Sequence, residues 1–120
     1  MGGIEGVEYP LVADTNKTIA RDYGVLAGDS KTCPDGKVCV EGEMVAYRGL
    51  FLIDKNGIVQ HEVVNNFPLG RSTEEEIRMV DALQHFETYG EVCPMNWHKG
   101  EDAMKPTSEG VAEYLKESYK

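Results

Sequence analysis

The main fold signal in the sequence is Gly49-Leu50-Phe51-Leu52-Ile53, followed directly by Asp54-Lys55-Asn56-Gly57. Its first part is a continuous apolar run, which is typical of a strand buried on both faces in a parallel or mixed sheet. Its second part contains Asn-Gly, a strong hairpin signal, so residues 58–64 are predicted to return as a second strand. This hairpin, together with the helical patterns in the rest of the chain, predicts an α/β architecture.

The clearest helical pattern follows the hairpin. Apolar residues recur every three positions from Ile77 to Phe86, behind candidate caps at Ser72-Thr73 and three consecutive glutamates. This pattern predicts a long helix that ends near Gly90 and packs against the sheet. Two shorter helices are predicted, over residues 17–23 and around residues 111–115.

Two segments before the hairpin lack helical periodicity. Residues 9–13 form a short apolar run that ends at Asp14, which predicts a strand running into a helix cap. From Gly24 to Met44 the pattern is irregular and rich in Gly, Asp, Ser, Pro and Lys. Because a connection of this length is unusual in a small domain, residues 29–43 or so are interpreted as an insertion.

The composition limits the classes of protein to consider. A chain of 120 residues with 41% hydrophobic residues has room for one small globular domain. Its formal net charge of −9 argues against nucleic acid and anionic membranes as partners. No apolar run approaches the roughly 18 residues that span a bilayer. The first residues show no secretion signal, so a cytoplasmic protein is expected.

One cysteine near the end of the chain and two arginines before it suggest thiol chemistry. Cys93 directly precedes Pro94, whereas Arg48 precedes the apolar strand and Arg71 precedes the long helix. Guanidinium groups stabilise thiolates and polarised oxygen atoms, which favours a redox site. Judged from the residues alone, an inert thiol at Cys93 and a surface ion pair at Arg48 remain alternatives.

Two further cysteines lie inside the irregular segment. Cys33 and Cys39 are separated by five residues that include Pro-Asp-Gly. Free thiols, a hairpin disulfide and a metal site are all compatible with this spacing, although zinc usually requires a tighter Cys-x-x-Cys. The histidines have no spacing that completes a metal site, so no metal and no cofactor are expected.

Five motifs in a fixed order suggest a family. They are Tyr9-Pro-Leu-Val-Ala-Asp14, Arg21-Asp-Tyr-Gly-Val-Leu26, Ala46-Tyr-Arg-Gly-Leu-Phe-Leu-Ile-Asp54, Pro68-Leu-Gly-Arg-Ser72, and Gly90-Glu-Val-Cys-Pro94 with Trp97. Together they resemble the carboxy-terminal two-thirds of a typical 2-Cys peroxiredoxin, of the alkyl hydroperoxide reductase type. The resemblance implies a thioredoxin-like fold and a thiol peroxidase that reduces hydrogen peroxide and alkyl hydroperoxides.

The resemblance also implies roles for particular residues. Cys93 would be the resolving cysteine, which condenses with the sulfenic acid of a peroxidatic cysteine on a partner subunit. Arg48 and Arg71 would flank that peroxidatic site. A thioredoxin-like protein or a flavoprotein disulfide reductase would reopen the disulfide, and the family forms dimers and decamers.

The chain departs from the family in one respect. The family's peroxidatic cysteine lies in a Pro-x-x-x-Thr-x-x-Cys motif, and neither Cys33 nor Cys39 has that spacing. The first strands and the helix that carries the peroxidatic cysteine are therefore expected to be missing from this chain. Residues 1–90 are interpreted as part of the thioredoxin-like domain, and residues 91–120 as an arm that carries the resolving cysteine.

Two functions follow from this departure. The first is the resolving part of a peroxidase, which requires another chain to supply the missing amino-terminal third. The second is a non-catalytic module that binds peroxiredoxin subunits or acts as an oligomeric, chaperone-like protein, since the strand around residues 50–53 would be partly uncovered.

Overall fold

The hairpin predicted around the Asn-Gly turn is confirmed in a computed structural model that describes residues 3–118. β3 (Arg48–Ile53) pairs with β4 (Val59–Asn65) in antiparallel register. The carboxylate of Asp54 fixes the turn, because it accepts the backbone N–H groups of Asn56 and Ile58 at 2.8 and 3.0 Å. These hydrogen bonds, that of Ile58 foremost, hold the pKa of the Asp54 carboxyl below its ordinary value.

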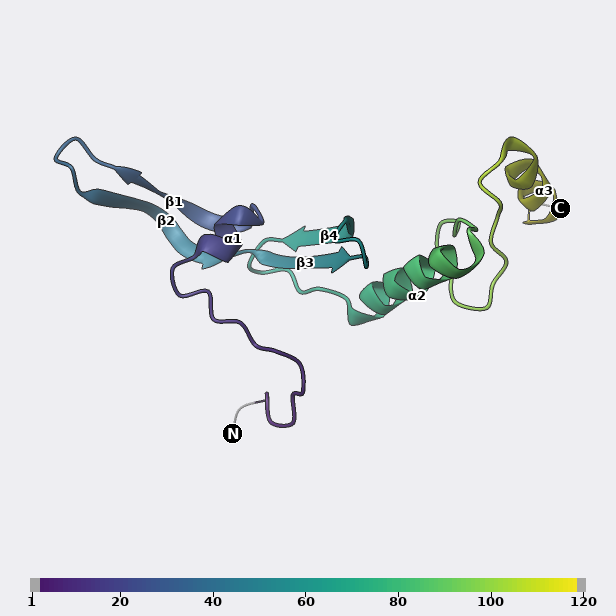
Figure 1. The fold of residues 1–120 in the computed structure, drawn as a ribbon, viewed down its shortest axis with the longest axis horizontal. Coiled ribbons are helices and arrows are strands. Elements are labelled where there is room, and N and C mark those ends of the chain that lie inside the picture. Colours follow the sequence, from purple (N-terminus) through teal and green to yellow (C-terminus); the bar gives the residue numbers. More distant parts are fainter. Residues whose placement is uncertain (1–2, 119–120) are drawn as a thin grey trace.

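The segment predicted to be irregular is a second antiparallel hairpin, so its irregular character is a wrong prediction, whereas the insertion at about residues 29–43 stays a prediction. β1 (Leu26–Thr32) pairs with β2 (Val38–Ala46), and a disulfide joins Cys33 to Cys39 beside the turn. Nothing among the described residues covers the outer part of this hairpin, so its strands need no regular alternation of apolar and polar residues. Figure 1 shows it projecting from one end of the molecule.

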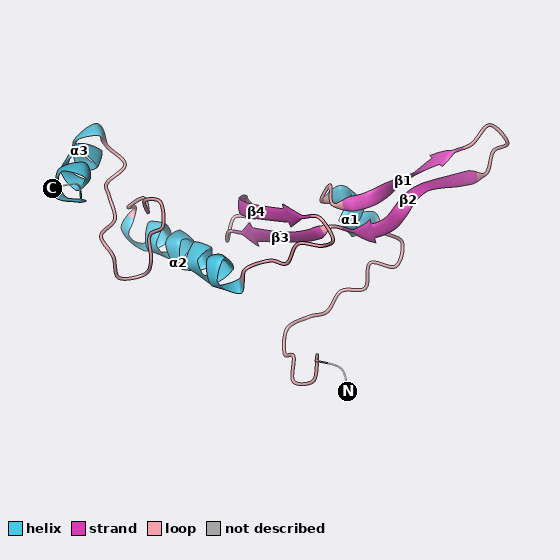
Figure 2. Ribbon diagram, turned by 180° about the vertical axis from the view of Figure 1, so that it is seen from behind, coloured by secondary structure: helices cyan, strands magenta, loops and turns pink. Residues whose placement is uncertain are grey.

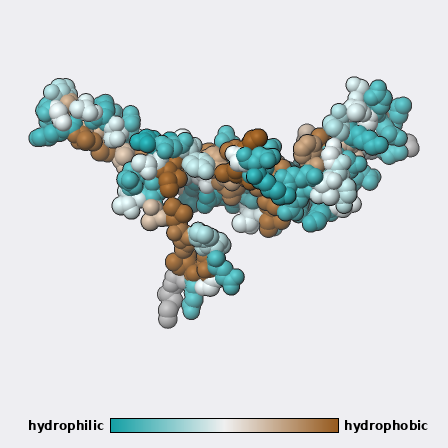
Figure 3. Space-filling view, in the orientation of Figure 1, coloured by the Kyte–Doolittle hydropathy of each residue, from teal (hydrophilic) through white to brown (hydrophobic). Residues whose placement is uncertain are grey.

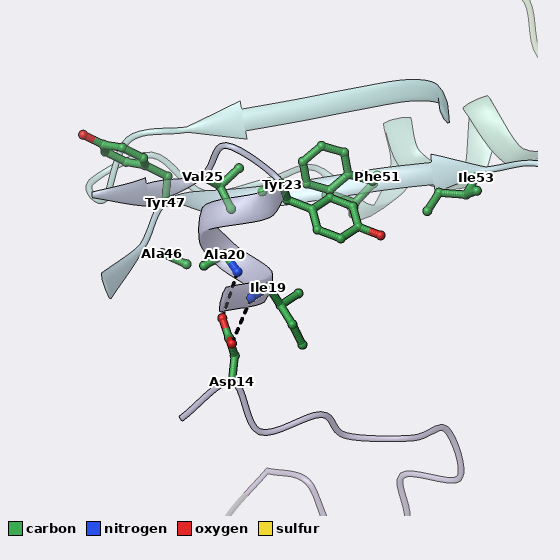
Figure 4. Close-up of a pocket in the computed structure, with 11 residues that line it drawn as sticks. Asp14, Ile19, Ala20, Tyr23, Val25, Ala46, Tyr47, Phe51 and Ile53 are labelled. Atoms are coloured by element: carbon green, nitrogen blue, oxygen red, sulfur yellow. Dashed lines mark hydrogen bonds between the residues drawn. The ribbon is translucent and has the colours of Figure 1, made fainter. Parts of the chain in front are cut away.

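The strand predicted at residues 9–13 is also wrong. This segment is extended but has no partner strand among the described residues, and Val12 is 75% exposed. The N-cap residue of the following helix is Lys17, which makes no side-chain capping bond; the carboxylate of Asp14 accepts the backbone N–H groups of Ile19 and Ala20 instead, at 3.1 and 2.8 Å (Figure 4). These hydrogen bonds stabilise the beginning of α1 (Thr18–Asp22). They also lower the pKa of the Asp14 carboxyl, and the bond from Ala20 is the main cause.

The two later helices are confirmed. α2 (Thr73–Tyr89) begins behind Ser72, whose hydroxyl accepts the backbone N–H of Glu75 at 3.3 Å. It ends at Gly90, whose left-handed conformation (φ 70°) favours glycine. α3 (Ser108–Ser118) follows a long connection and lies at the far end of the chain from the β1–β2 hairpin (Figure 2).

Very little apolar surface is removed from solvent. Among residues 3–118 only Ala20, Val25 and Trp97 are buried apolar residues. The radius of gyration is 20.3 Å, whereas a compact domain of this length has about 14 Å. The expectation that β3 is buried on both faces is wrong, because its central residues are only partly buried and, within residues 3–118, the strands form two separate two-stranded sheets without a layer that covers both faces. Apolar residues consequently reach the surface (Figure 3).

The described residues contain no helix with the length and apolar character needed to cross a membrane. The structure does not describe residues 1–2, at the start of the predicted unit 1–90, or residues 119–120, at the end of the predicted unit 91–120. The boundary predicted between residues 90 and 91 follows the end of α2 but stays a prediction.

Candidate functional site

The two arginines singled out in the sequence are anchored on neighbouring parts of one structural unit. Arg48, the first residue of β3, donates its Nε–H to the carbonyl oxygen of Phe67 at 2.7 Å. Arg71 reaches back from the segment after β4 and donates from Nη1 to the carbonyl oxygen of Gly49 at 2.8 Å. Each guanidinium therefore ties the loop of residues 66–71 to the beginning of β3.

The loop itself is held in place by two further contacts. The side-chain amide of Asn65, which is the register partner of Arg48, donates to the carbonyl oxygen of Gly70 at 2.8 Å. The rings of Tyr47 and Phe67 stack with centroids 5.1 Å apart. Sequence reasoning did not identify Asn65 as part of the site. Its position at the end of a strand, directly before a loop with Pro and Gly, is the signal that could have found it.

Neither arginine has a carboxylate partner within residues 3–118. All nine ion pairs in this part of the chain involve other residues. Both arginines are solvent-exposed. In a chain with a net charge of −9, two guanidinium groups that both bind backbone carbonyls around the loop of residues 66–71 favour an anion or a developing negative charge nearby. The alternative of a surface ion pair at Arg48 is therefore not observed.

Cys93 lies in a different environment, behind the end of α2. Its thiol is half-buried, with Sγ 3.9 Å from the carbonyl oxygen of Ala82. Cys93 lines a largely apolar cavity of about 390 Å³ between α2 and the β3–β4 hairpin. The cavity is lined by Leu52, Gln60, His61, Met79, Ala82, Leu83, Phe86, Val92 and Cys93.

This environment disfavours the thiolate form of Cys93. Burial is the main cause that raises the pKa of Cys93 above its ordinary value. The guanidinium of Arg78 opposes the shift, and the carboxylate of Glu91 adds to it. Cys93 therefore lacks the lowered pKa that is typical of a thiol attacking peroxide. Its surroundings fit a thiol that reacts with a sulfur already oxidised elsewhere.

Arg78 and Trp97 hold the loop that carries Cys93. Arg78 forms a two-fold hydrogen-bonded pair with Glu75, both contacts at 2.7 Å, and donates from Nη1 to the carbonyl oxygen of Trp97 at 3.1 Å. The Trp97 side chain is 1% exposed, and its indole N–H donates to the carbonyl oxygen of Glu101. Trp97 is therefore packed within its own loop. Arg78 was missed, although the i, i+3 spacing of Glu75 and Arg78 on one helix was a usable signal.

The arginine pair and Cys93 occupy opposite ends of the β3–β4 hairpin. The arginines lie where β3 begins, whereas the cavity of Cys93 includes Leu52, near the end of the same strand. Four residues along a strand cover about 13 Å. The arginines and the cavity of Cys93 are therefore separated along β3 in this arrangement.

The other candidate residues are accounted for by packing. Cys33 and Cys39 form a disulfide rather than free thiols or a metal site, with Cα atoms 5.7 Å apart. His61 Nε2 lies 3.3 Å from Glu76 Oε2 without hydrogen-bond geometry, and His85 Nε2 lies 3.0 Å from Glu91. The described residues contain no group of three or more side chains suited to hold a metal ion.

Two family models match the chain. The model described as the AhpC/TSA family matches residues 4–62, which include Arg48. The model described as the C-terminal domain of 1-Cys peroxiredoxin matches residues 82–117, which include Cys93.

Individual relatives agree with these models. Alkyl hydroperoxide reductase C of Helicobacter pylori strain J99 is 53% identical over 98% of this chain, which corresponds to 52% of the relative. A crystal structure of reduced Plasmodium vivax 2-Cys peroxiredoxin is 48% identical, with a TM-score of 0.71 over 88% of this chain and 48% of that one. A yeast mitochondrial 1-Cys peroxiredoxin is 28% identical, with a TM-score of 0.66 over 85% of this chain and 46% of its own.

These similarities define the class as peroxiredoxins, which have a thioredoxin-like fold. The chain belongs to the peroxiredoxins of the AhpC/TSA family. It spans about half the length of the curated relatives it matches.

Proposed function

We propose that this chain supplies the resolving cysteine, Cys93, and the active-site arginines, Arg48 and Arg71, of a 2-Cys peroxiredoxin. The peroxidatic cysteine comes from polypeptide outside these 120 residues, since none of the three cysteines has the family's motif. The observation that carries the proposal is the pair of guanidinium groups anchored by the carbonyl oxygens of Phe67 and Gly49 without a carboxylate partner.

The arginine pair supports the first chemical step. A peroxidatic thiolate attacks one oxygen of the peroxide, becomes a sulfenic acid and releases water or an alcohol after protonation. Two cations next to the reacting atoms favour the thiolate and stabilise the charge that develops on the departing oxygen. Anchoring on backbone carbonyls fixes their positions, so little reorganisation is needed during the reaction.

Cys93 supports the second step. Its thiol condenses with the sulfenic acid, which forms a disulfide and releases one water molecule. Because Cys93 lies at the other end of β3 from the arginines, its sulfenic partner belongs to another subunit's site. The thiol must also leave its cavity. The segment that moves is tied to the rest of the arm by two backbone hydrogen bonds between Val92 and Met104, at 2.8 and 3.0 Å.

The remaining partners follow from this chemistry. A dithiol protein of the thioredoxin type or a flavoprotein disulfide reductase reopens the disulfide by exchange. The similar yeast mitochondrial 1-Cys peroxiredoxin has a thiol resolving mechanism via glutathione/thioredoxin systems, which supports this class of reductant. Hydrogen peroxide and alkyl hydroperoxides are the proposed substrates, a homo-oligomer is the proposed assembly, and the cytoplasm is the proposed location. The names of the relatives do not favour the non-catalytic alternative.

The test is peroxide consumption coupled to a thioredoxin system, measured with this chain plus a chain that carries the amino-terminal part of a peroxiredoxin. Cys93→Ser is expected to abolish recycling and to leave a single round of thiol oxidation. The matched control is the Cys33→Ser/Cys39→Ser double variant, which keeps recycling. Undiminished recycling by Cys93→Ser contradicts the resolving role.

The arginine pair is tested in the same assay. Arg48→Lys keeps the charge but loses the planar donor geometry, so the rate of the peroxide step is expected to fall roughly 10²-fold. Arg21→Lys is the control, because Arg21 forms only an exposed ion pair with its neighbour Asp22. An unchanged rate in Arg48→Lys shows that the guanidinium does not contact the reacting atoms.

A further inference from the structure

The β1–β2 hairpin consists of two halves with different support. In the half near the rest of the chain, Val25 is buried and its carbonyl oxygen accepts the backbone N–H of Tyr47 at 2.7 Å. This contact ties the beginning of β1 and the end of β2 to β3. The hairpin base also borders the pocket of about 450 Å³ in Figure 4, where Tyr23 and Phe51 meet with ring centroids 4.7 Å apart.

A bulge separates this supported half from the outer half. The register shifts between Ala27 and Asp29, where Gly28 and Gly42 cross at close range. A Cβ on Gly42 would lie 2.7 Å from the Cα of Gly28, and both glycines have positive φ values, 144° for Gly28 and 93° for Gly42. The bulge interrupts the ladder and gives the hairpin a natural boundary.

The outer half has almost no tertiary support. It runs from Asp29 to Thr32 and back from Val38 to Glu41. Val38 and Val40 are 74% and 59% exposed, so no apolar face of this part is covered. An isolated two-stranded ribbon of this kind is marginally stable in water at best. Two cross-links join its strands besides the ladder: the Cys33–Cys39 disulfide and an exposed ion pair between Lys31 and Glu41 at 2.9 Å.

The ion pair contributes little, so the disulfide is the main stabilising element. Both partners of the ion pair are more than half exposed, and such pairs are strongly screened by solvent. The cysteines are only partly buried and lie at the end of the molecule that projects farthest from α2 and α3 (Figure 1). Another protein's thiol can therefore reach the sulfur atoms. Lys31 and Lys37 flank the cysteines, and each is paired with a carboxylate, of Glu41 and of Asp35 respectively.

We propose that Cys33–Cys39 is a second, exchangeable disulfide of this protein, and that its reduction by a dithiol unfolds the outer half of the β1–β2 hairpin. The reacting partner is a dithiol protein or a small dithiol. One of its thiolates attacks one sulfur of the disulfide and forms a mixed disulfide, while the other cysteine leaves as a thiolate and takes up a proton. The partner's second thiol then attacks the mixed disulfide, so the partner ends oxidised and both cysteines end reduced.

This step is independent of the proposed peroxidase function, because it involves neither Cys93 nor the arginine pair. The hairpin is ordered when the disulfide is closed and disordered when it is open, so the change is a redox-controlled order–disorder transition. Oxidation by a disulfide of the same chemical class reverses it.

The test is amide hydrogen exchange on this chain with Cys93→Ser, in complex with a chain that carries the amino-terminal part of a peroxiredoxin, before and after equilibration with a dithiol buffer in the absence of denaturant. Reduction is expected to raise exchange by roughly tenfold or more at residues 29–32 and 38–41. Exchange in the β3–β4 hairpin, measured in the same sample, is expected to stay unchanged. Trypsin cleavage after Lys31 is expected to accelerate in parallel, whereas cleavage after Lys55 does not change.

Two variants complete the test. Cys33→Ser/Cys39→Ser is expected to exchange like the reduced protein under all conditions. Lys31→Gln removes the ion pair but keeps the disulfide, and is expected to exchange like the oxidised protein. The proposal is overturned if the disulfide resists reduction without denaturant, or if it is reduced and residues 29–32 and 38–41 keep their protection.

Discussion

At the scale of single residues, the two kinds of functional group differ in how their charge is treated. Arg48 and Arg71 are exposed and have no carboxylate partner within residues 3–118, and each donates one hydrogen bond to a backbone carbonyl. Burial, with a smaller contribution from Glu91 and against the effect of Arg78, raises the pKa of Cys93. The arginines are therefore suited to stabilise negative charge immediately, whereas the cysteine reacts only when its loop moves or when an oxidised sulfur reaches it.

The raised pKa of Cys93 predicts the pH dependence of its alkylation. Because only the thiolate reacts, the pH midpoint of alkylation is expected above that of an exposed cysteine. Glu91→Gln removes a negative charge that raises the pKa, so the midpoint moves to lower pH. Iodoacetamide labelling rates measured from pH 6 to about 10 by mass spectrometry check this shift.

Glu43→Gln, on the exposed β1–β2 hairpin, is the matched control and should leave the midpoint in place. A Glu91→Gln midpoint equal to that of the unchanged chain contradicts the electrostatic contribution. The sign for stability follows from the same shift. The folded state holds the thiol proton of Cys93 more tightly than the unfolded state does. The resulting contribution to the free energy of unfolding is fully present below the ordinary cysteine pKa and is lost as the pH rises through the raised pKa of Cys93.

At the scale of elements, the loop after α2 depends on one side chain. Trp97 is the largest side chain that is fully buried among the described residues, and its carbonyl oxygen accepts a hydrogen bond from Arg78 on α2. The ring of His85 lies 5.0 Å from the indole, centroid to centroid. One aromatic residue therefore holds the Cys93 loop against the helix.

Trp97→Ala is expected to release this loop. The loss of a buried tryptophan costs about 3–5 kcal/mol where the surroundings do not relax, which exceeds what two backbone bonds at Val92 supply. The rate of Cys93 alkylation at neutral pH should rise clearly. Met95→Ala is the matched control, since Met95 lies in the same loop and is 89% exposed. Equal labelling rates in both variants would show that the loop is held by other contacts.

At the scale of the whole molecule, the missing core is the dominant feature. Three buried apolar residues cannot offset the conformational entropy of ordering 116 described residues (3–118). Large apolar residues such as Leu11, Ile77 and Tyr89 remain more than 60% exposed. The surface of this chain is therefore suited to be covered by further polypeptide of the same fold.

This predicts how the chain unfolds. Alone, it is expected to show no sharp thermal transition and to bind an apolar dye such as ANS. With a chain that carries the amino-terminal part of a peroxiredoxin, dye binding should fall and a cooperative transition should appear in calorimetry. A sharp two-state transition of the chain alone contradicts this prediction. The Cys33→Ser/Cys39→Ser variant serves as control, because the outer hairpin contributes little to any shared core.

The sequence predicted the elements that depend on local signals. Asn56-Gly57 predicted the β3–β4 turn, and Ser72 and Gly90 predicted the ends of α2. Each of these rests on hydrogen bonds between residues that are close in the chain. The family motifs added the roles of Arg48, Arg71 and Cys93, which stay proposals.

Local signals failed where pairing depends on distant or absent partners. Residues 9–13 have the composition of a strand but no strand beside them in the described part of the chain, and β3 has the composition of a buried strand but no covering layer there. The β1–β2 hairpin has the composition of a loop but forms a ladder, with a disulfide that joins its strands beside the turn.

By itself, the sequence determined the family, the helices and the turn at Asn56-Gly57, because these depend on residue types and short-range hydrogen bonds. Three facts required the three-dimensional arrangement of the chain. Both arginines bind around one loop and have no carboxylate partner within residues 3–118. Cys93 lies at the other end of the hairpin, and Cys33 is joined to Cys39. Those facts depend on which distant groups meet in space, and spacing along the chain does not fix that.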